Sequence, residues 1–167
     1  MAQSFRILLV EDDDSLRACL GEFLASQGWG VASTAFATEA LALMGRHRFD
    51  FGLLDFHLPE TTGPELLQQL GAVRPLPSIL MSGLANPAEV AAAQQAGFFT
   101  FLRKPLDLNR LRQSLEMLIQ QHFGGPLTPL DHLGRPLTRR QHPGQQHPGQ
   151  QHPGQPHPHH PKAPPPQ

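Results

Sequence analysis

Short apolar runs alternate with stretches of helical spacing along the first 122 residues of the chain. The runs cover residues 5–10, 30–34, 51–54, 78–81 and 98–102. Runs this short and this apolar are typical of strands buried on both faces, and helices between them are typical of parallel crossovers. Such crossovers are right-handed and cover both faces of one sheet. The sequence therefore predicts an α/β fold with a doubly wound, five-stranded parallel sheet.

Capping and proline signals mark where the helices begin. Asp13 or Asp14 can cap the first helix, because a carboxylate accepts hydrogen bonds from its free amide groups. Pro64 and Pro87 open the third and fourth helices, at the position where a missing amide hydrogen has no partner to lose. The last helix is expected over residues 107–122, where leucines recur on one face and a Gly-Gly-Pro sequence then ends it.

The composition changes at residue 123, which predicts a globular domain over residues 4–122 and a tail over residues 123–167. The first 122 residues carry 9 Lys/Arg and 13 Asp/Glu, a net charge of −4, and the remainder carries 4 and 1, a net charge of +3. Neither part is basic enough to indicate nucleic-acid binding. The tail repeats Gln-His-Pro-Gly-Gln and has few apolar side chains, so we expect it to be disordered.

The histidines of this tail allow two interpretations. His142, His147 and His152 recur every five residues, and neutral imidazoles bind nickel, copper or zinc. A flexible segment gives such a site no preorganisation, so we favour a solvated tether over physiological metal binding.

The sequence predicts neither a targeting segment nor a membrane span. The first apolar run is stopped at once by four acids, which argues against a signal peptide or a membrane span. The single cysteine, Cys19, lies in an apolar helical pattern and is expected to be a reduced, buried thiol. These features predict a cytoplasmic protein.

Charged residues follow three of the predicted strands. The acids Glu11, Asp12, Asp13 and Asp14 follow the first strand, Asp55 follows the third and Lys104 follows the fifth. The carboxyl ends of parallel strands meet at one edge of a sheet, so carboxylates and an ammonium would share a crevice there. Oxygen ligands suit Mg²⁺, and a lysine can neutralise phosphate charge. The pattern therefore predicts a phosphate-accepting signalling switch.

Other phosphate-binding classes fit the pattern less well. A dinucleotide-binding protein would have a glycine-rich, anion-attracting turn after the first strand, whereas the turn here is anionic. A Walker lysine loop is also missing from the sequence. Enzymes of the haloacid dehalogenase class place a second acid two residues after the reactive aspartate, and that position is His57.

Four motifs in order carry a specific resemblance. They are Val10-Glu-Asp-Asp13, Leu53-Leu-Asp-Phe-His-Leu-Pro59 followed by Gly63, Met81-Ser-Gly83 and Phe101-Leu-Arg-Lys-Pro105. Over residues 4–121 the chain resembles the receiver domain of two-component response regulators. The resemblance implies a flavodoxin-like sheet in the order 2-1-3-4-5 with five helices. It also implies phosphorylation of the aspartate that follows the third strand.

The resemblance assigns a role to each matching residue. Asp55 would accept the phosphoryl group, Lys104 would pair with Asp55 and then with the phosphoryl group, and Ser82 would donate its hydroxyl. Phe101 would turn inward when Ser82 moves. The Mg²⁺ ligands would be Glu11, Asp12, Asp55 and the backbone carbonyl of His57. Lys104-Pro105 is a bond that is usually cis in the family. Without this frame, Ser82 and Phe101 carry little signal, because a strand-end serine and a core phenylalanine are common.

Helix caps are the main alternative for the acidic cluster. Asp13 and Asp14 are best explained as cap and dipole partners of the first helix, whereas for Glu11 and Asp12 the site interpretation is stronger. The side chain of His57 is expected to face solvent at the mouth of the site.

The partners follow from the resemblance and from the tail. The phosphoryl donor would be a sensor histidine kinase or a phosphotransfer protein, and the chain would be a phosphoacceptor rather than an enzyme. The tail cannot supply a DNA-binding domain, so we expect output through contacts with a downstream protein, without direct DNA binding. Residues 86–121 would form the output surface and could support a homodimer. The alternatives are an unphosphorylated adaptor with the same fold and a shortened relative of a longer regulator.

Overall fold

The computed structural model describes residues 4–84 and 86–124. Strands and helices alternate in the order β1 (Arg6–Val10), α1 (Asp14–Ser26), β2 (Gly30–Thr34), α2 (Ala37–Arg46), β3 (Phe51–Asp55), α3 (Gly63–Val73), β4 (Ser78–Ser82), α4 (Pro87–Ala96), β5 (Thr100–Arg103) and α5 (Leu108–Phe123). Helix α5 ends one residue beyond the predicted boundary. The prediction of a disordered tail concerns residues that, apart from Phe123 and Gly124, lie outside the described part of the chain.

The five strands form one parallel sheet in the order β2-β1-β3-β4-β5. The central strand β3 pairs Leu53 with Leu9 of β1 and with Ile79 of β4. The predicted fold class, strand number and strand order are therefore confirmed. In a parallel sheet every carboxyl end lies on the same edge, so the residues after β1, β3 and β5 all lie along that edge.

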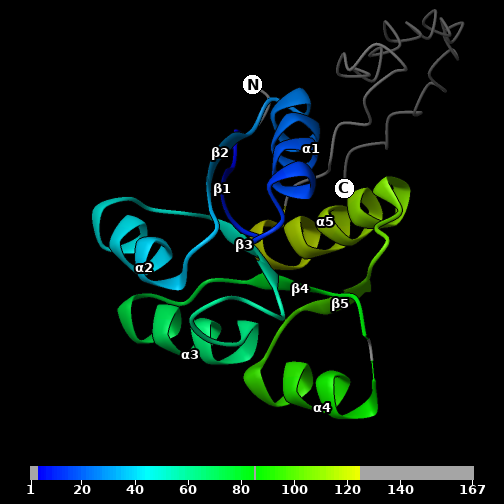
Figure 1. Cartoon of the computed structure of the whole chain (residues 1–167). Helices are drawn as coiled ribbons and strands as arrows, with labels where there is room; N and C mark the ends of the chain where they lie inside the picture. Colours follow the sequence, from blue (N-terminus) through cyan, green and yellow to red (C-terminus); the bar gives the residue numbers. More distant parts are fainter. Residues whose placement is uncertain (1–3, 85, 125–167) are drawn as a thin grey trace, which may run out of the picture.

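Alternate residues of each strand pack against two different helical layers (Figure 1). Ile7 and Leu9 of β1 pack with leucines of α1 and α5, whereas Leu8 and Val10 pack with apolar residues of α2, α3 and α4. All four of these side chains are fully buried. Each contributes about 1.5–3 kcal/mol by leaving water. This two-sided core fixes the register of β1 and, with it, the position of Glu11 and Asp12.

Strand β5 begins later than the sequence predicted. The apolar run starts at Phe98, but the strand starts at Thr100. Helix α4 ends at Gly97 in the left-handed conformation, and the amide of Phe98 then donates to the Ala93 carbonyl. That amide satisfies the end of the helix rather than a strand pairing, which accounts for the shorter strand.

The prediction that Cys19 is buried was wrong, because the structure places this free cysteine at the surface. Leu20 and Leu24, which lie four residues apart, form the buried line of α1. Successive helical residues are rotated by about 100°, so Cys19 falls beside that line and faces outward. Within residues 4–84 and 86–124, no helix has the length and apolar character that crossing a membrane requires.

Helix α3 begins in close contact with the strand that ends in Asp55. Thr62 and Glu65 form a capping box, in which each side chain bonds the backbone amide of the other. The amide of Gly63 donates to the Phe56 carbonyl at 2.8 Å. A Cβ atom at Gly63 would lie 2.5 Å from the carbonyl oxygen of Asp55. The lack of a side chain at position 63 is therefore required for the approach of α3 to β3.

We expect Gly63→Ala to lower the free energy of unfolding by about 2–3 kcal/mol, because the methyl group forces the backbone of Asp55 or α3 to move. The matched control is Gly71→Ala in the same helix, where an added Cβ meets no atom within 4 Å. That change is expected to raise the free energy of unfolding by about 0.5–1 kcal/mol. Urea denaturation measures both, and equal effects would contradict the packing argument.

Candidate functional site

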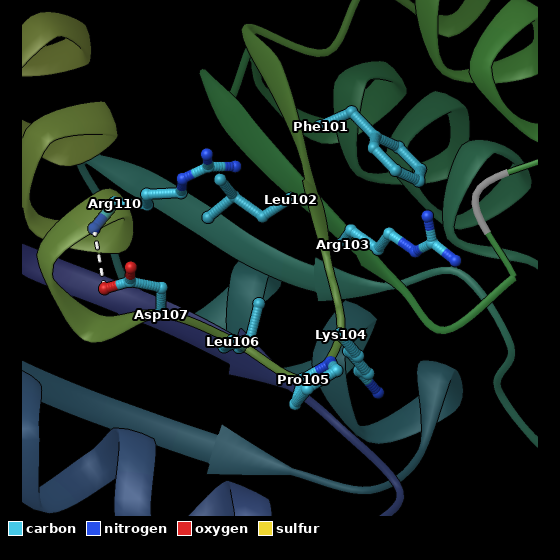
Figure 2. Close-up of a pocket in the computed structure, with 8 residues that line it drawn as sticks. All are labelled: Phe101, Leu102, Arg103, Lys104, Pro105, Leu106, Asp107 and Arg110. Atoms are coloured by element: carbon cyan, nitrogen blue, oxygen red, sulfur yellow. Dashed lines mark hydrogen bonds between the residues drawn. The ribbon is translucent and has the colours of Figure 1, made fainter.

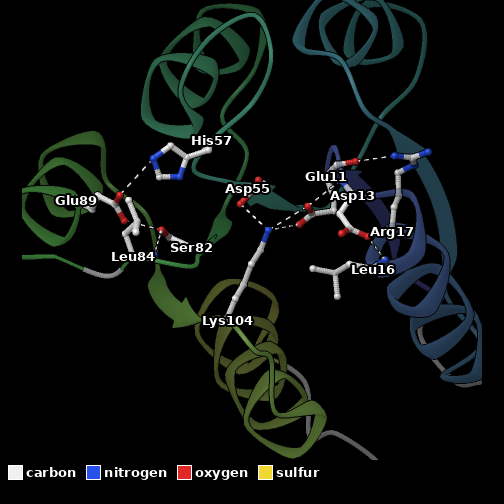
Figure 3. Close-up of polar contacts among 10 residues, drawn as sticks. All are labelled: Glu11, Asp13, Leu16, Arg17, Asp55, His57, Ser82, Leu84, Glu89 and Lys104. Atoms are coloured by element: carbon white, nitrogen blue, oxygen red, sulfur yellow. Dashed lines mark hydrogen bonds and ion pairs between the residues drawn. The ribbon is translucent and has the colours of Figure 1, made fainter.

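The strand ends bring four charged side chains together at one edge of the sheet. Figure 3 shows three of them, Glu11, Asp55 and Lys104. Glu11 and Asp12 follow β1, Asp55 is the last residue of β3 and Lys104 follows β5. The side chains of Glu11 and Asp55 are only 0% and 4% exposed, whereas Asp12 is exposed to solvent. The structure thus collects in one place the predicted acceptor, the predicted lysine and two of the predicted metal ligands.

Lys104 links the two buried carboxylates directly. Its Nζ atom lies 2.9 Å from Oδ1 of Asp55 and 2.8 Å from Oε2 of Glu11, and it donates a hydrogen bond to Oε1 of Glu11 at 3.0 Å. Oε2 of Glu11 is in close charge contact with Nζ, but this buried oxygen accepts no hydrogen bond from the described residues. The Lys104–Pro105 peptide bond that follows is cis.

Burial dominates the protonation of the two carboxyl groups. It raises the pKa of Asp55, and the ammonium of Lys104 only partly opposes this effect, while the charge of Asp12 raises it further. The pKa of Glu11 is likewise raised by burial, against the hydrogen bond from Lys104. For Lys104, burial lowers the pKa, but the hydrogen bonds to Glu11 and Asp55 outweigh it and the net direction is upward. The site stabilises the cation and leaves the carboxylates short of positive charge.

The three carboxylates have the arrangement that a divalent cation needs. One oxygen from each of Glu11, Asp12 and Asp55 lies within 4.8 Å of the others. When ionised, they carry two more negative charges than Lys104 balances. Mg²⁺ prefers oxygen ligands and keeps several of its waters, so a few protein oxygens with this charge suffice. His57 lies two residues after Asp55, and its carbonyl stays a predicted ligand.

The remaining acids of the cluster serve helix α1, as expected. The side chain of Asp13 accepts a hydrogen bond from the amide of Leu16 at 2.7 Å and caps the helix. Asp14 is paired with Arg17 at 2.5 Å on the exposed first turn. Arg17 also donates to the backbone carbonyl of Glu11 at 2.8 Å, which ties the loop after β1 to the helix.

Ser82, the last residue of β4, contacts a residue that the sequence did not single out. Its hydroxyl donates to Oε2 of Glu89 at 2.5 Å, and its oxygen accepts from the amide of Leu84 at 3.3 Å. The other oxygen of Glu89 lies 3.4 Å from Nε2 of His57. Glu89 is 5% exposed. In the sequence it is one acid in the first turn of an alanine-rich helix, where acids are common for dipole reasons, so no signal marked it as buried.

Phe101 and Lys104 border a surface hollow of about 570 Å³ (Figure 2). The hollow is lined by residues 101–107 and Arg110, from β5 and the first turn of α5. The ring of Phe101 is half-buried and packs against the helical layer of α2, α3 and α4. The hollow lies within the segment predicted as an output surface and does not include Asp55. It shares Lys104 with the carboxylate site but none of the three carboxylates.

The sequence model of the response regulator receiver domain matches residues 7–116. Since this match covers more than half of the chain, the chain belongs to the response regulator receiver family. It contains a receiver domain of two-component response regulators, a class of domain that is phosphorylated and that generally binds Mg²⁺ through acidic residues.

Curated relatives are considerably longer than the matched region. Over 116 residues the chain is 32% identical to the transcriptional regulatory protein GlrR of Escherichia coli (strain K12), which covers 69% of this chain and 26% of GlrR. It is 33% identical over 115 residues to the C4-dicarboxylate transport transcriptional regulatory protein DctD of Rhizobium meliloti (strain 1021), covering 68% of this chain and 25% of DctD. The chain thus spans about a quarter of the length of these relatives.

Solved structures of receiver domains superpose on the described fold. A CheY-like receiver domain protein from Methanospirillum hungatei JF-1 is 30% identical with a TM-score of 0.67, covering 74% of this chain and 100% of that chain. The receiver domain of HemR from Leptospira biflexa, in its non-phosphorylated form, is 31% identical with a TM-score of 0.65, covering 70% and 94%. The likeness extends over nearly the whole length of both receiver domains.

Mg²⁺ is expected to stabilise the folded chain, because it binds the folded carboxylate site and not the unfolded chain. At a hundredfold excess over its dissociation constant, it should raise the free energy of unfolding by about 2.7 kcal/mol. Asp12→Asn should require a higher Mg²⁺ concentration for the same effect, since it removes one of the grouped charges. Asp14→Asn should respond like the wild type, because Asp14 follows Asp12 closely in the chain but is not one of the three grouped carboxylates. Thermal unfolding across a Mg²⁺ titration measures this, and identical curves for the two variants would contradict the site.

The stability of the Mg²⁺-free chain should depend on the charge of Asp55. Its pKa is raised in the folded state, so ionisation opposes folding. The protonated Asp55 carboxyl contributes fully to stability below its ordinary pKa of 3.8, and this contribution is lost as the pH rises through the raised pKa of the folded state. The free energy of unfolding of the wild type, relative to Asp55→Asn, should therefore fall as the pH rises from the ordinary value of 3.8 through the raised folded value. Urea denaturation with a chelator present tests this, and a difference that rises with pH would contradict it.

Proposed function

We propose that the chain is a single-domain response regulator of the cytoplasm that accepts a phosphoryl group on Asp55. The donor would be the phosphohistidine of a sensor histidine kinase or of a phosphotransfer protein. The observation that carries the proposal is the position of the Asp55 carboxylate, 2.9 Å from the Lys104 ammonium and grouped with Glu11 and Asp12. A carboxylate in that position has cationic charge beside it and lies close enough to two other carboxylates to share a divalent cation with them.

The reaction is an in-line displacement at phosphorus. An oxygen of Asp55 forms a bond to phosphorus while the phosphorus–nitrogen bond of the donor breaks, and the imidazole of the donor keeps the electron pair and takes a proton. The product is a carboxyl phosphate, which water later hydrolyses to Asp55 and inorganic phosphate. Such transfer asks the protein mainly for positioning and for neutralisation of charge. In this sense the chain is a phosphoacceptor that assists its own modification rather than an enzyme.

Each residue of the site has a part in this scheme. Lys104, which now pairs with Asp55, would pair with a phosphoryl oxygen after transfer, and Ser82 would donate its hydroxyl to another. Phe101 would turn inward as Ser82 moves. The residues that would hold Mg²⁺ are Glu11, Asp12, Asp55 and the carbonyl of His57. Bound Mg²⁺ supplies charge neutralisation at the phosphoryl oxygens.

Output is proposed to go through protein contacts of residues 86–121, which include the hollow between β5 and α5. The support is the composition of residues 123–167, which is rich in Pro, Gly, Gln and His and is not typical of a DNA-binding fold, so we propose a downstream protein target and no direct DNA contact. Dimerisation through the same surface is an alternative use of it. Two alternatives compete with this proposal. The chain could be an adaptor that binds without phosphorylation, or a shortened relative of a longer regulator such as GlrR or DctD.

Incubation with acetyl phosphate and Mg²⁺, followed by intact-mass measurement, tests the proposal. The wild type should gain one phosphate, and Asp55→Asn should gain none because the amide is not nucleophilic at this site. Asp50→Asn is the matched control at the opposite end of β3, where the amide oxygen can still accept the hydrogen bond from Arg6. It should be labelled like the wild type.

The competing outcomes are distinct. Labelling that persists in Asp55→Asn would assign the acceptor elsewhere. A wild type that gains no phosphate from acetyl phosphate or from a cognate kinase would favour the adaptor function and overturn the proposed one.

A further inference from the structure

The hydroxyl of Ser82 is already engaged in the structure. It donates to the carboxylate of Glu89 at 2.5 Å, and both side chains are buried, at 0% and 5% exposure. A serine hydroxyl has one hydrogen to donate, so it cannot bond the Glu89 carboxylate and a phosphoryl oxygen on Asp55 at the same time. Figure 3 shows the Ser82 hydroxyl directed to Glu89, while Lys104 is directed to Glu11 and Asp55. The proposed phosphoryl contact of Ser82 therefore requires the bond to Glu89 to break.

Glu89 also connects Ser82 to helix α4. The buried residues of this helix are Glu89 and Ala93, so the apolar anchoring of α4 is small. The second oxygen of Glu89 faces Nε2 of His57 at 3.4 Å, and His57 follows β3. The Glu89 carboxylate of α4, a helix of the proposed output surface, therefore contacts residues at the ends of both β3 and β4. A change at Ser82 therefore alters a contact of Glu89, one of the two buried residues of α4.

We propose that Glu89 is a positioning residue that holds Ser82 in its resting orientation and opposes phosphoryl capture at Asp55. The inference rests on the proposed function, because it concerns the same phosphoryl group. A hydrogen bond to a charged group changes an equilibrium constant by about tenfold or more. Releasing Ser82 from Glu89 should therefore make the phosphoryl-bound form easier to reach and should loosen α4 at the same step.

Removal of a nearby negative charge is the competing explanation for any effect of Glu89. It predicts that Glu89→Gln and Glu89→Ala act equally and that neither depends on Ser82. The positioning role predicts that Glu89→Gln acts less, because its amide oxygen still accepts the Ser82 hydrogen, and that the effect disappears when Ser82 has no hydroxyl. A double-mutant cycle with Ser82→Ala separates the two.

In the test, beryllofluoride, a stand-in for the phosphoryl group, is titrated into the full chain in the presence of Mg²⁺. Binding is followed by NMR through the backbone amide signals of residues 99–104. Glu89→Ala should lower the half-saturating beryllofluoride concentration by about tenfold, and Glu89→Gln by clearly less. In the Ser82→Ala background, Glu89→Ala should change it by less than about twofold. Glu116→Ala, which removes an exposed carboxylate from α5, is the matched control and should bind like the wild type. The same spectra report whether each variant is folded.

Several results would overturn the inference. They are unchanged or weaker binding in both Glu89 variants, equal effects of the two, or an effect of Glu89→Ala that survives in the Ser82→Ala background. Acetyl phosphate labelling of the wild type keeps this separate from the proposed function. A labelled wild type without coupling between Ser82 and Glu89 refutes only the inference, whereas an unlabelled wild type refutes both.

Discussion

One ammonium group shared by two buried carboxylates is the constraint on which the site depends. Lys104 meets Glu11 and Asp55 at 2.8 and 2.9 Å, although 93 residues separate Lys104 from Glu11 in the chain. Removing Lys104 would leave two buried carboxylates without the cation that compensates them, which is strongly destabilising. The raised pKa values of both carboxyl groups indicate that even Lys104 does not fully compensate their burial. The site is built with a deficit of positive charge, and that deficit is what a divalent cation and a transferring phosphoryl group can use together.

The sheet makes this cluster unavoidable once the strands pair. Apolar side chains on both faces of β1 and β3 fix their register, so the residues after Val10 and the end of β3 must lie at the same edge. Gly63 then lets α3 approach to within contact of the Asp55 carbonyl. The position of Asp55 is therefore set by the packing of β3, by the close approach of α3 and by the ion pair with Lys104.

Two groups expected to contact a phosphoryl oxygen have other partners in the described structure. Lys104 bonds carboxylates within the site, whereas Ser82 bonds Glu89, a carboxylate carried by α4. If Lys104 replaces a carboxylate by a phosphoryl oxygen, the change involves only residues at the strand ends. If Ser82 replaces Glu89 by a phosphoryl oxygen, the change also involves α4, a helix with little apolar anchoring. Weakly anchored elements move at low free-energy cost. This difference gives a physical reason for phosphorylation at Asp55 to affect α4 rather than the layer of α1 and α5.

The sequence by itself determined the alternation of strands and helices, the helix caps and the candidate site, because apolar periodicity, capping residues and acids after strands are local patterns. Asp12, Asp55 and Lys104 could be placed together on the premise of parallel strands alone. Tertiary structure decided the exposure of Cys19, the late start of β5 and the burial of Glu89 against Ser82. Each of these depends on how a helix is rotated on the sheet or how it ends, and that is set by long-range packing, which a local pattern does not encode.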